Sequence, residues 1–440
     1  MSISESVRAW VVSADMGYGH HRAVFPLRHI AEGGVISVGR DAASSSGERQ
    51  LWNRLLGVYE SFSRARGIPI IGKPLFTLLD RFLHIPSFYP IRDLSRSTFQ
   101  VDLLASSVRQ GLCRGMLQTV KSNHIPLITS FYAPAIAADM DGYDPIYCII
   151  CDADLNRVWV AKEPWESRIH YFAPCGRAGQ RLKAYGVQED RIYLTGFPLP
   201  DELVGGVGLD VLKADLGQRL HYLDPGNRFW PLHERSVEHF LGAGNCIFRR
   251  KRVLTISYAV GGAGAQKEMG GRLARSLKSR LHAGTLRLNL IAGLKKSVQE
   301  YFMRVKTDIG GDPDAIDVIW AEDVQEYFTL FNAAMRNTDI LWTKPSELSF
   351  YSGLGVPIVM TPTIGSQEKF NRQWLYEIQA GIKQENPDHA DQWLFDLLYN
   401  GRLAEAAWSG FLKARKLGTY KILEVLQTGT MTKSDSPVMR

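Results

Sequence analysis

Short apolar runs alternate along the chain with longer stretches in which apolar residues recur every three or four positions. A short run is typical of a buried parallel strand, and the longer spacing is typical of an amphipathic helix. The first half predicts strands at 8–14, 35–38, 125–130, 146–151, 169–172 and 192–195. Helices are expected between them at 20–32, 133–139 and 175–185. This alternation is typical of βαβ units around a parallel sheet.

The same alternation restarts at residue 253. Strands are predicted at 253–258, 286–292, 318–320, 340–342 and 357–360, and helices at 267–281, 295–305, 324–334, 346–354, 367–380 and within 391–426. The expected fold class is therefore α/β, with Rossmann-like doubly wound domains at 1–200 and 253–427. Two such domains are expected to face each other across a cleft at the carboxyl ends of their strands, where open sheets bind ligands.

Three segments depart from the alternation. Residues 40–123 indicate a helical insertion that includes a helix at 101–120, residues 201–252 a linker with a second helical insertion, and residues 428–440 a flexible tail. Residues 67–83 mix basic and large apolar side chains. That mixture fits a membrane-surface element or an ordinary packed domain face, and the sequence leaves both open.

Composition excludes several classes of protein. An apolar fraction of 45% and a charged fraction of 22% rule out a fibrous or disordered chain. The net charge of +7 is compatible with an anionic partner but does not indicate which kind of anion it would be. Basic residues are scattered without the basic–aromatic array of a stacking platform, so no nucleic-acid partner is expected. With no apolar leader and no membrane-spanning run, we expect a cytoplasmic protein that touches a membrane only peripherally, at its inner face.

The five cysteines indicate no disulfide scaffold and no zinc site. Five is too few for a scaffold in a chain of 440 residues. Cys148 and Cys151 have C-x-x-C spacing, but they lie in an apolar run, and no second pair exists to complete a metal site. We expect both to be buried strand cysteines.

The first candidate site follows the first predicted strand. The turn Gly17-Tyr18-Gly19-His20 joins that strand to a helix, and glycines there let the backbone approach a ligand. The turn is not the dinucleotide fingerprint, because Arg22 stands where the third glycine would be. The imidazole of His20 titrates near neutrality and can take a proton from a hydroxyl group. A histidine that merely caps the helix would give the same pattern.

The second candidate site is the turn at 261–266, with the sequence Gly-Gly-Ala-Gly-Ala-Gln, again between a strand and a helix. Small residues, backbone amides and the positive end of a helix dipole suit a diphosphate. The turn lacks the Gly-Lys-[Ser/Thr] ending of a nucleoside triphosphatase loop, which disfavours ATP hydrolysis. Tight packing alone would also explain its glycines.

Polar residues also gather at two later helix starts. Residues 343–347 (Thr-Lys-Pro-Ser-Glu) precede one helix, and Ser346 suits its N-cap position. The second start, at 365–371, has amide and carboxylate side chains that suit sugar hydroxyls approaching from several directions: Gln367, Glu368 and Asn371. Taken singly, each segment is an ordinary helix start with polar caps.

Together these motifs resemble the GT-B glycosyltransferases. The similarity rests on Gly-x-Gly-His-x-x-Ala at 17–23, Thr-Gly-Phe-Pro at 195–198, Thr-Lys-Pro at 343–345, Gly-x-Pro at 355–357 and Gly-x-Gln-Glu-x-x-Asn at 365–371. The stretch from Asp152 to Trp159 and Tyr-Phe-Ala-Pro at 171–174 add to it. It covers about residues 8–36, 146–200 and 253–382. The group that it resembles comprises processive diacylglycerol glucosyltransferases, monogalactosyldiacylglycerol synthases and the lipid-intermediate N-acetylglucosaminyltransferase of peptidoglycan synthesis.

The resemblance implies an enzyme that moves a hexose or N-acetylhexosamine from a nucleotide-sugar, typically a UDP-sugar, to a lipid or membrane-proximal acceptor. It makes His20 the catalytic base and places Gly17, Gly19 and Asp152 on the acceptor side. The nucleotide-sugar would be held by residues of the C-terminal domain: Gly261, Gly262, Gly264, Ala265, Gln266, Lys344, Ser346, Glu347, Gln367, Glu368 and Asn371. Such enzymes use neither a metal nor another cofactor, because amides stabilise the leaving diphosphate. A single displacement with inversion is the expected outcome.

Two departures from the family pattern leave other functions open. Phe350 stands where the family carries a glutamate that holds the nucleotide ribose, and Glu347 is one helical turn earlier. Asn156 stands where a histidine is common, after Cys151-Asp152 in place of Thr-Asp. These changes favour an alternative, a catalytically inactive GT-B-like protein that binds a ligand or partner. A sugar-nucleotide epimerase is a third hypothesis, with Glu368 or Asp152 as its carboxylate.

Overall fold

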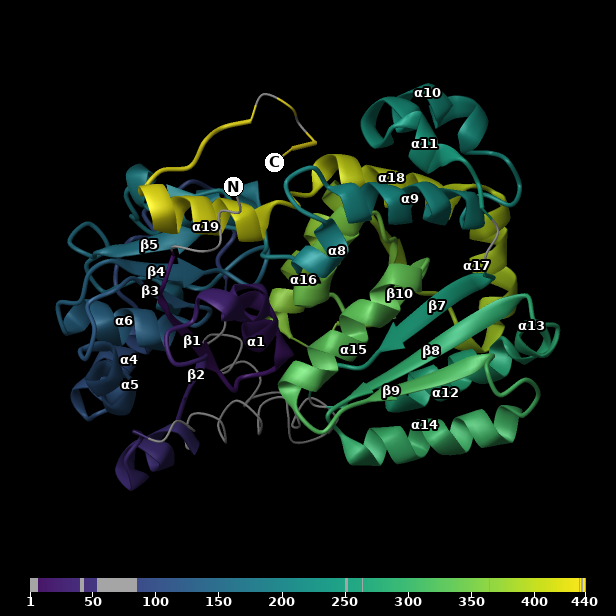
Figure 1. Cartoon of the computed structure of the whole chain (residues 1–440). Helices are drawn as coiled ribbons and strands as arrows, with labels where there is room; N and C mark the ends of the chain where they lie inside the picture. The colour runs from purple at the N-terminus through teal and green to yellow at the C-terminus, as the bar shows by residue number, and fades with distance from the viewer. Residues whose placement is uncertain are drawn as a thin grey trace. The chain divides into compact units, whose positions relative to one another are not determined.

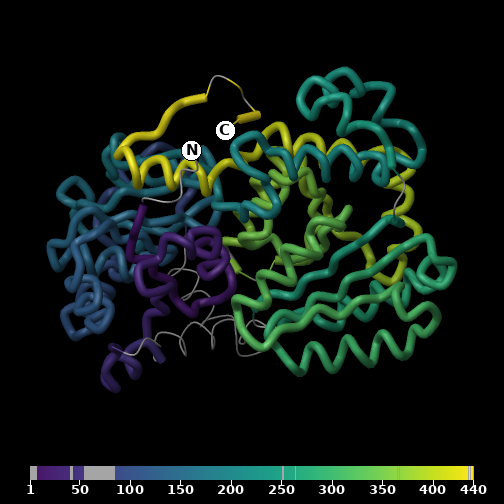
Figure 2. Tube along the Cα trace, in the orientation of Figure 1, coloured from purple at the N-terminus to yellow at the C-terminus, as the bar shows by residue number. Residues whose placement is uncertain are grey.

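The computed structural model of the chain describes residues 7–39, 43–53, 85–249, 252–262, 264–363, 365–434, 436 and 438–439. The segment 67–83 lies outside the described residues. Contacts divide the chain into two units (Figures 1 and 2). The N-terminal unit comprises Met1–Pro198, Thr363–Asn371 and Leu417–Lys433, and the C-terminal unit comprises Leu199–Pro362, Arg372–Lys416 and Ser434–Arg440.

A parallel sheet forms the centre of the N-terminal unit. Its strands are β1 (Trp10–Ala14), β2 (Ile36–Val38), β3 (Leu127–Thr129), β4 (Ile146–Ile149), β5 (Ile169–Phe172) and β6 (Ile192–Tyr193). Their order is β2-β1-β3-β4-β5-β6, and every pairing is parallel. The chain goes from β1 to one neighbour and then returns to pair β3 on the other side. The strand order therefore reverses between β1 and β3.

The described helices of this unit lie between successive strands, except for α19 at the end of the chain. They are α1 (Tyr18–Val24), η1 (Phe25–Ile30), α4 (Phe99–Arg109), α5 (Arg114–Val120), α6 (Tyr132–Met140), η2 (Arg157–Trp159), α7 (Gly176–Ala184), η3 (Glu189–Arg191) and α19 (Gly418–Thr428). In α6 the small residues between 133 and 138 are all buried, which lets this helix pack closely on β3 and β4. Its neighbour α4 buries one face and leaves Leu103 exposed.

The C-terminal unit has a second parallel sheet. Its strands are β7 (Leu254–Ala259), β8 (Leu286–Gly293), β9 (Ile316–Trp320), β10 (Ile340–Thr343), β11 (Ile358–Met360) and β12 (Gly381–Lys383). Read from β9, the order is β9-β8-β7-β10-β11-β12. That is the Rossmann order 3-2-1-4-5-6, with the reversal between β7 and β10. Right-handed crossovers in opposite directions from the reversal put helices on both faces of the sheet.

The helices of the C-terminal unit follow the same scheme. They are α8 (Asp201–Val204), α9 (Asp210–Tyr222), α10 (Trp230–Leu241), α11 (Ala243–Cys246), α12 (Lys267–Ser276), α13 (Lys278–His282), α14 (Lys296–Ile309), α15 (Val324–Asn337), η4 (Glu347–Leu354), η5 (Pro387–His389), α17 (Ala390–Tyr399) and α18 (Arg402–Lys413). A further helix, α16 (Ser366–Glu377), starts in the N-terminal unit and continues in this one. In Figure 1, α14 runs beside β9, and α14 packs on both β8 and β9.

The two sheets confirm the expected fold class, GT-B with two Rossmann-like doubly wound domains. Residues 201–252, expected as a linker with a helical insertion, group with the C-terminal unit. Arg219 of α9 is fully buried there and donates to the backbone carbonyls of Thr338 (2.8 Å) and Leu354 (2.9 Å). Among the described residues, no helix is both long and apolar enough to span a bilayer.

Three predicted helices are interrupted in the structure, and one of them, predicted at 267–281, divides at Leu277 into α12 and α13. The helix predicted at 20–32 is an α-helix followed by the 3₁₀ helix η1, because Pro26 has no N–H to continue the α-helical ladder. The helix predicted at 101–120 breaks between α4 and α5, where Gly111 (φ 110°) and Cys113 (φ 66°) adopt left-handed backbone angles. The short edge strand β12 was missed, since Gly381-Ile382-Lys383 has only one large apolar residue.

The end of the chain also differs from the pattern. Residues 417–433 group with the N-terminal unit, although the sequence assigned 253–427 to one domain. The segment 428–440, expected to be a flexible tail, makes specific contacts in its described part. Lys416 donates to the carbonyl oxygen of Val438 (2.8 Å), and the side chain of Val438 is buried.

Candidate functional site

The first candidate site lies where the N-terminal sheet reverses its strand order. In an open α/β sheet this point is where ligands bind, because the loops after the two adjacent strands diverge. Here the loop after β1 begins at Asp15 and leads through Gly17 to His20, and the loop after β3 begins at Ser130. Gly17 has φ 112°, a value that glycine adopts readily and other residues rarely. The sequence therefore needs glycine at this turn.

His20 joins the two loops. Its Nδ1 lies 2.7 Å from the carbonyl oxygen of Ser130. A carbonyl oxygen only accepts hydrogen bonds, so Nδ1 carries the proton, and in the neutral ring Nε2 holds the lone pair. The ring also packs edge-on against Phe131 (centroids 4.9 Å apart) and lies near Trp159 (6.2 Å). Nε2 is therefore the atom of this side chain that can take a proton.

The neighbouring His21 has a different environment. Its Nδ1 lies 3.2 Å from Oγ of Ser13, and its Nε2 lies 3.6 Å from a carboxylate oxygen of Asp15. The residue types match a nucleophile–histidine–carboxylate array, but Ser13 is fully buried within β1. A hydroxyl that no substrate can reach is not a nucleophile, so this group fixes the turn after β1.

Asp152 and Asn371 contact each other within the N-terminal unit. The side-chain amide of Asn371 donates to Oδ1 of Asp152 (2.8 Å), and its oxygen accepts from the backbone N–H of Ala153 (2.7 Å). Asn371 is fully buried. Both functional atoms of this side chain thus have protein partners, and the contact fixes the loop that follows β4.

Gln367 and Glu368 lie in the first turn of α16, in the part of that helix that groups with the N-terminal unit. Glu368 is buried and Gln367 is partly exposed. The sequence grouped both residues with the 261–266 turn as donor-side contacts. The structure instead assigns the two groups of residues to different units.

The second candidate site lies at the reversal point of the C-terminal sheet. The turn 261–266 follows β7, and Lys344 follows β10, the adjacent strand. A Cβ on Gly261 would lie 2.5 Å from Cε and 3.3 Å from Nζ of Lys344, so the lysine side chain lies directly over the glycine. The two loops are therefore in contact, and they bring a cation to the glycine-rich backbone.

The other described residues of the turn shape its exit into α12. Gly262 lies in the turn and Ala265 in its last part, while Ala263 is outside the described residues. A Cβ on Gly264 would lie 3.0 Å from Val298 and 3.5 Å from Cγ of Lys295. Lys295 follows β8, so a second lysine flanks the turn.

Gln266 connects the turn to the loop after β11. Its side-chain amide donates to the carbonyl oxygen of Pro362 (3.0 Å) and accepts from Oγ1 of Thr361 (2.7 Å). Its own carbonyl oxygen accepts from the hydroxyl of Tyr258 (2.6 Å). As the N-cap residue of α12 it makes no side-chain capping bond. The N-cap side chain therefore accepts no hydrogen bond from the first-turn amides of α12. A helix start that binds an anion must meet this condition, because the anion takes the place of the cap.

The remaining predicted donor-side residues lie at the start of η4. Ser346 is the N-cap residue, but its side chain makes no capping hydrogen bond. Glu347 is buried at the first position of η4. Phe350 is 2% exposed and packs against Trp374, with ring centroids 4.9 Å apart. The position where the family carries a ribose-binding glutamate is an aromatic core position in this chain.

The cysteines form no disulfide bond, and four of the five are buried. All five cysteines are free, and Cys148 and Cys151 are buried as expected. Burial raises the pKa of the Cys175 thiol to about 12, so it stays protonated at neutral pH. In the described part of the chain, no cluster of three or more histidine, cysteine or carboxylate side chains is arranged to hold a metal ion.

Sequence reasoning missed three contact residues: Ser130, Lys295 and Thr361. Each follows directly after a strand, or within two residues of its end, at the carboxyl edge of a sheet. Lys344 was identified from the family resemblance, whereas the rule that ligands bind at the carboxyl ends of strands would also have found Lys295, because it follows a predicted strand. No local signal marks Ser130, because its carbonyl matters only through the distant His20.

The structure shows a GT-B fold in which each of the two sheets has polar side chains at its point of strand reversal. A family model described as a domain of unknown function (DUF6938) matches residues 297–424. A comparison of the sequence with curated proteins finds no match.

Several solved structures resemble the chain at low sequence identity. They include S. aureus MnaA with UDP (12% identity, TM-score 0.48, 96% of each chain covered). UDP-GlcNAc 2-epimerase from Neisseria meningitidis bound to UDP-GlcNAc is 11% identical, with a TM-score of 0.47 over 96% of this chain and 100% of that one. Acinetobacter baumannii MurG is 13% identical, with a TM-score of 0.44 over 96% and 99%. Identities this low do not assign a function, which must come from the site residues.

Proposed function

We propose that this protein is a glycosyltransferase that moves a hexose or N-acetylhexosamine from a nucleotide-sugar, specifically a UDP-sugar, to a lipid or membrane-proximal acceptor. The observation that carries the proposal is the contact between Gly261 and Lys344 at the reversal point of a Rossmann-ordered sheet. The reaction needs no metal and inverts the anomeric centre. The protein works in the cytoplasm, at the inner face of the membrane.

The donor binds the C-terminal unit through its diphosphate. The glycine turn lets phosphate oxygens approach the backbone, and the uncapped start of α12 offers N–H donors and a positive dipole end. Lys344 adds a full positive charge from the adjacent loop. The charge that develops on the leaving diphosphate is stabilised by these fixed groups, which is an electrostatic form of catalysis.

The acceptor hydroxyl is deprotonated by His20. Its Nδ1–H is held by the carbonyl of Ser130, which orients the ring and keeps Nε2 as the basic nitrogen. The oxygen of the acceptor then attacks the anomeric carbon, its proton passes to Nε2, and the bond to the nucleoside diphosphate breaks. Attack on the face opposite the leaving group gives inversion.

Thermal denaturation of the full chain with UDP-, GDP-, ADP- and CDP-sugars tests the donor. A ligand at about 100 times its Kd stabilises the folded state by about 2.7 kcal/mol, which raises Tm by several degrees. We expect the rise with a UDP-sugar and its loss in Lys344→Ala. Lys278→Ala is the matched control. This exposed lysine begins α13, which leads into the amino end of β8, whereas Lys344 follows the carboxyl end of β10. The donor assignment is wrong if none of the four classes raises Tm.

Removing the base tests the chemistry separately. We expect His20→Ala to lower transfer by about 10²- to 10⁴-fold while the Tm shift with the donor stays. Phe350 and Asn156 favour a second candidate, a protein that binds the donor without turnover. Donor binding with no transfer or hydrolysis in the wild-type protein would establish that candidate in place of the enzyme.

A further inference from the structure

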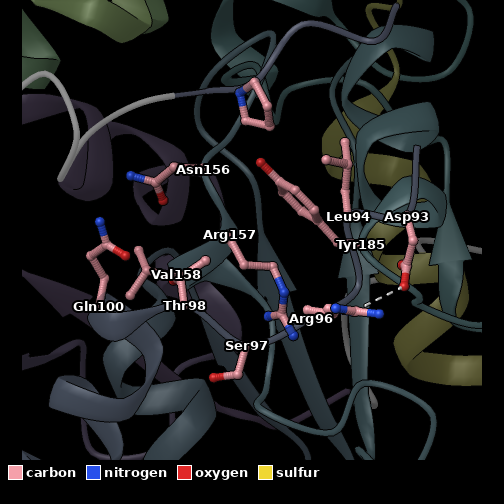
Figure 3. A pocket seen from close by; sticks show the side chains of 11 residues that line it. Asp93, Leu94, Arg96, Ser97, Thr98, Gln100, Asn156, Arg157, Val158 and Tyr185 are labelled. Carbon is pink, nitrogen blue, oxygen red and sulfur yellow. Dashed lines mark ion pairs between the residues drawn. The ribbon is translucent and has the colours of Figure 1, made fainter. Parts of the chain in front are cut away.

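A cavity lies wholly within the N-terminal unit and includes none of the candidate donor or base residues in its lining. It has a volume of about 290 Å³ and is walled by residues 93–100, which lead into α4, by η2 with the residue before it, and by Tyr185 (Figure 3). This volume is at the lower end of the range for small-molecule sites, which is about 300–1,000 Å³. It therefore suits a ligand of monosaccharide size.

Two polar atoms in the wall of this cavity have no hydrogen-bond partner among the described residues. Asn156 is only 6% exposed, and no donor within the described residues reaches its side-chain oxygen. The hydroxyl oxygen of Thr98 is also buried without a hydrogen bond to any part of the chain that the structure describes. Figure 3 shows both side chains among those that line the cavity. Buried polar atoms are nearly always hydrogen-bonded, so two exceptions in the lining of one cavity indicate a missing ligand group.

Arg157, the buried cation of the wall, is already engaged. All five N–H donors of Arg157 go to backbone carbonyls, those of Ser95, Val160, Ala161 and Lys162. Asp93 accepts from the backbone N–H and hydroxyl of Ser95 and pairs with Arg96 at 3.8 Å. The guanidinium of Arg157 thus builds the wall and has no donor left for an anion.

The chemistry of the two unpartnered atoms identifies the ligand class. An amide oxygen accepts only, so the group that it binds must donate an N–H or O–H. Carboxylates and phosphodiesters have no such hydrogen, whereas a sugar hydroxyl donates to Asn156 and can also bond the hydroxyl of Thr98. Leu94 and Val158 line the same cavity with apolar surface suited to the C–H faces of a sugar ring.

We propose that this cavity is a binding site for a neutral polyhydroxylated molecule of monosaccharide size, recognised by the side chains of Asn156 and Thr98. The site goes beyond the proposed donor and base sites and does not depend on them. The same turn carries Trp159, whose ring lies near His20. A ligand in the cavity therefore lies against the 156–159 turn, the element that also contacts the base.

Binding of methyl α-D-glucopyranoside and N-acetyl-D-glucosamine to the full chain tests this site. We expect a saturable signal in saturation-transfer NMR below roughly 10 mM, and slower hydrogen exchange in peptides covering 95–100 and 155–160. Thr98→Val keeps the shape and removes the hydroxyl, and Asn156→Ala removes the acceptor. Each should weaken binding about tenfold, because one hydrogen bond to the ligand is lost. Thr98→Val should fold with unchanged or higher Tm, since it removes an unsatisfied atom.

The controls separate this site from other causes. Asn123→Ala replaces an exposed asparagine of the same unit and should bind both sugars as the wild type does. Lys344→Ala should also bind them normally, so failure of the donor site leaves this test intact. Equal binding by the wild type, Asn156→Ala and Thr98→Val would overturn the proposal. So would inorganic phosphate that binds and depends on Asn156, or no binding of either sugar at this concentration.

Discussion

Gly261 lies under the side chain of Lys344, and this contact offers the sharpest test at the scale of one residue. The backbone at 261 does not adopt a left-handed angle, so alanine fits the main chain, but its Cβ would lie 2.5 Å from Cε of Lys344. The flexible lysine can move away, at the cost of its position over the turn. We expect Gly261→Ala to fold normally and to bind the nucleotide-sugar about tenfold more weakly, measured by calorimetry.

Gly244→Ala is the matched control for this change. Gly244 belongs to the same unit, and a Cβ there would contact nothing within 4 Å. Unchanged affinity in Gly261→Ala, or an equal loss in both variants, would show that the lysine does not act at the turn.

Single residues also show what the sequence could not reveal. The turn that carries His20 is recognisable from its glycines, but the protonation of its ring depends on a carbonyl of Ser130, which is remote in sequence. Asn371 is another case, since its polar side chain suggested a ligand contact. In the structure it bonds Asp152 and Ala153, and only the three-dimensional contact reveals those partners. Residue type predicts which hydrogen bonds and proton transfers a side chain can make, whereas the fold determines which partner it makes them with.

Among the strands, β5 carries a histidine whose environment makes stability depend on pH. Burial and, secondarily, the charge of Arg191 lower the pKa of His170 below its ordinary 6.5. Its ring lies between those of Tyr147 (5.3 Å) and Tyr193 (5.9 Å). Below pH 6.5 the unfolded chain therefore binds a proton more readily than the folded one. The free energy of unfolding must fall as the pH drops below 6.5, until the folded-state pKa is reached.

His170→Phe keeps the aromatic contacts and removes the titrating group. We expect a weaker loss of stability between pH 7 and pH 5, by at most about 1.4 kcal/mol per pH unit, measured by urea unfolding. His29→Phe, at an exposed position, is the control. Burial also lowers the pKa of His221, so part of the pH dependence should persist. Identical pH profiles for His170→Phe and the wild type would contradict this account.

At the scale of elements, the sequence predicted most strands and located their ends within a few residues. The run of β4 is continuous, buried and apolar, so its pattern has one interpretation. Prediction failed where one residue or a remote contact decides the outcome. At Pro26 the predicted α-helix changes to the 3₁₀ helix η1, and α4 ends just before Gly111. The edge strand β12 exists only because β11 pairs with it, and no pattern within three residues encodes that pairing.

For the whole molecule, the path of the chain limits what the domain prediction could achieve. Periodicity reveals where one sheet ends and another begins, but the chain passes from one unit to the other more than once after residue 198. Helix α19 looks in sequence like a continuation of the C-terminal domain. Its side-chain pattern specifies that one face is buried and says nothing about which unit buries it.

The assignment of α19 leads to a prediction for the full chain. In the N-terminal unit α19 buries Ile422, Leu423 and Val425. The helix begins close to the backbone of this unit, since a Cβ at Gly418 would lie 2.3 Å from the carbonyl oxygen of Phe197. At its other end, the hydroxyl of Tyr193 donates to the carbonyl oxygen of Gly429 (3.0 Å). Burying one such aliphatic side chain contributes about 1.5–3 kcal/mol. Deleting residues 417–440 should therefore destabilise the N-terminal unit by several kcal/mol, although the deleted segment lies at the opposite end of the chain.

Hydrogen exchange read by mass spectrometry locates the effect. Peptides from β5 and β6 should lose protection in the chain that ends at residue 416, while those from β7 to β9 keep most of theirs. A chain that ends at residue 433 is the control, because it retains α19 and loses only the segment with Val438, which contacts Lys416 of the C-terminal unit. Since the two deletions differ only in residues 417–433, a difference confined to the first would locate the contribution of α19. Equal protection of β5 and β6 in the two chains would show that the N-terminal unit is complete without its last helix.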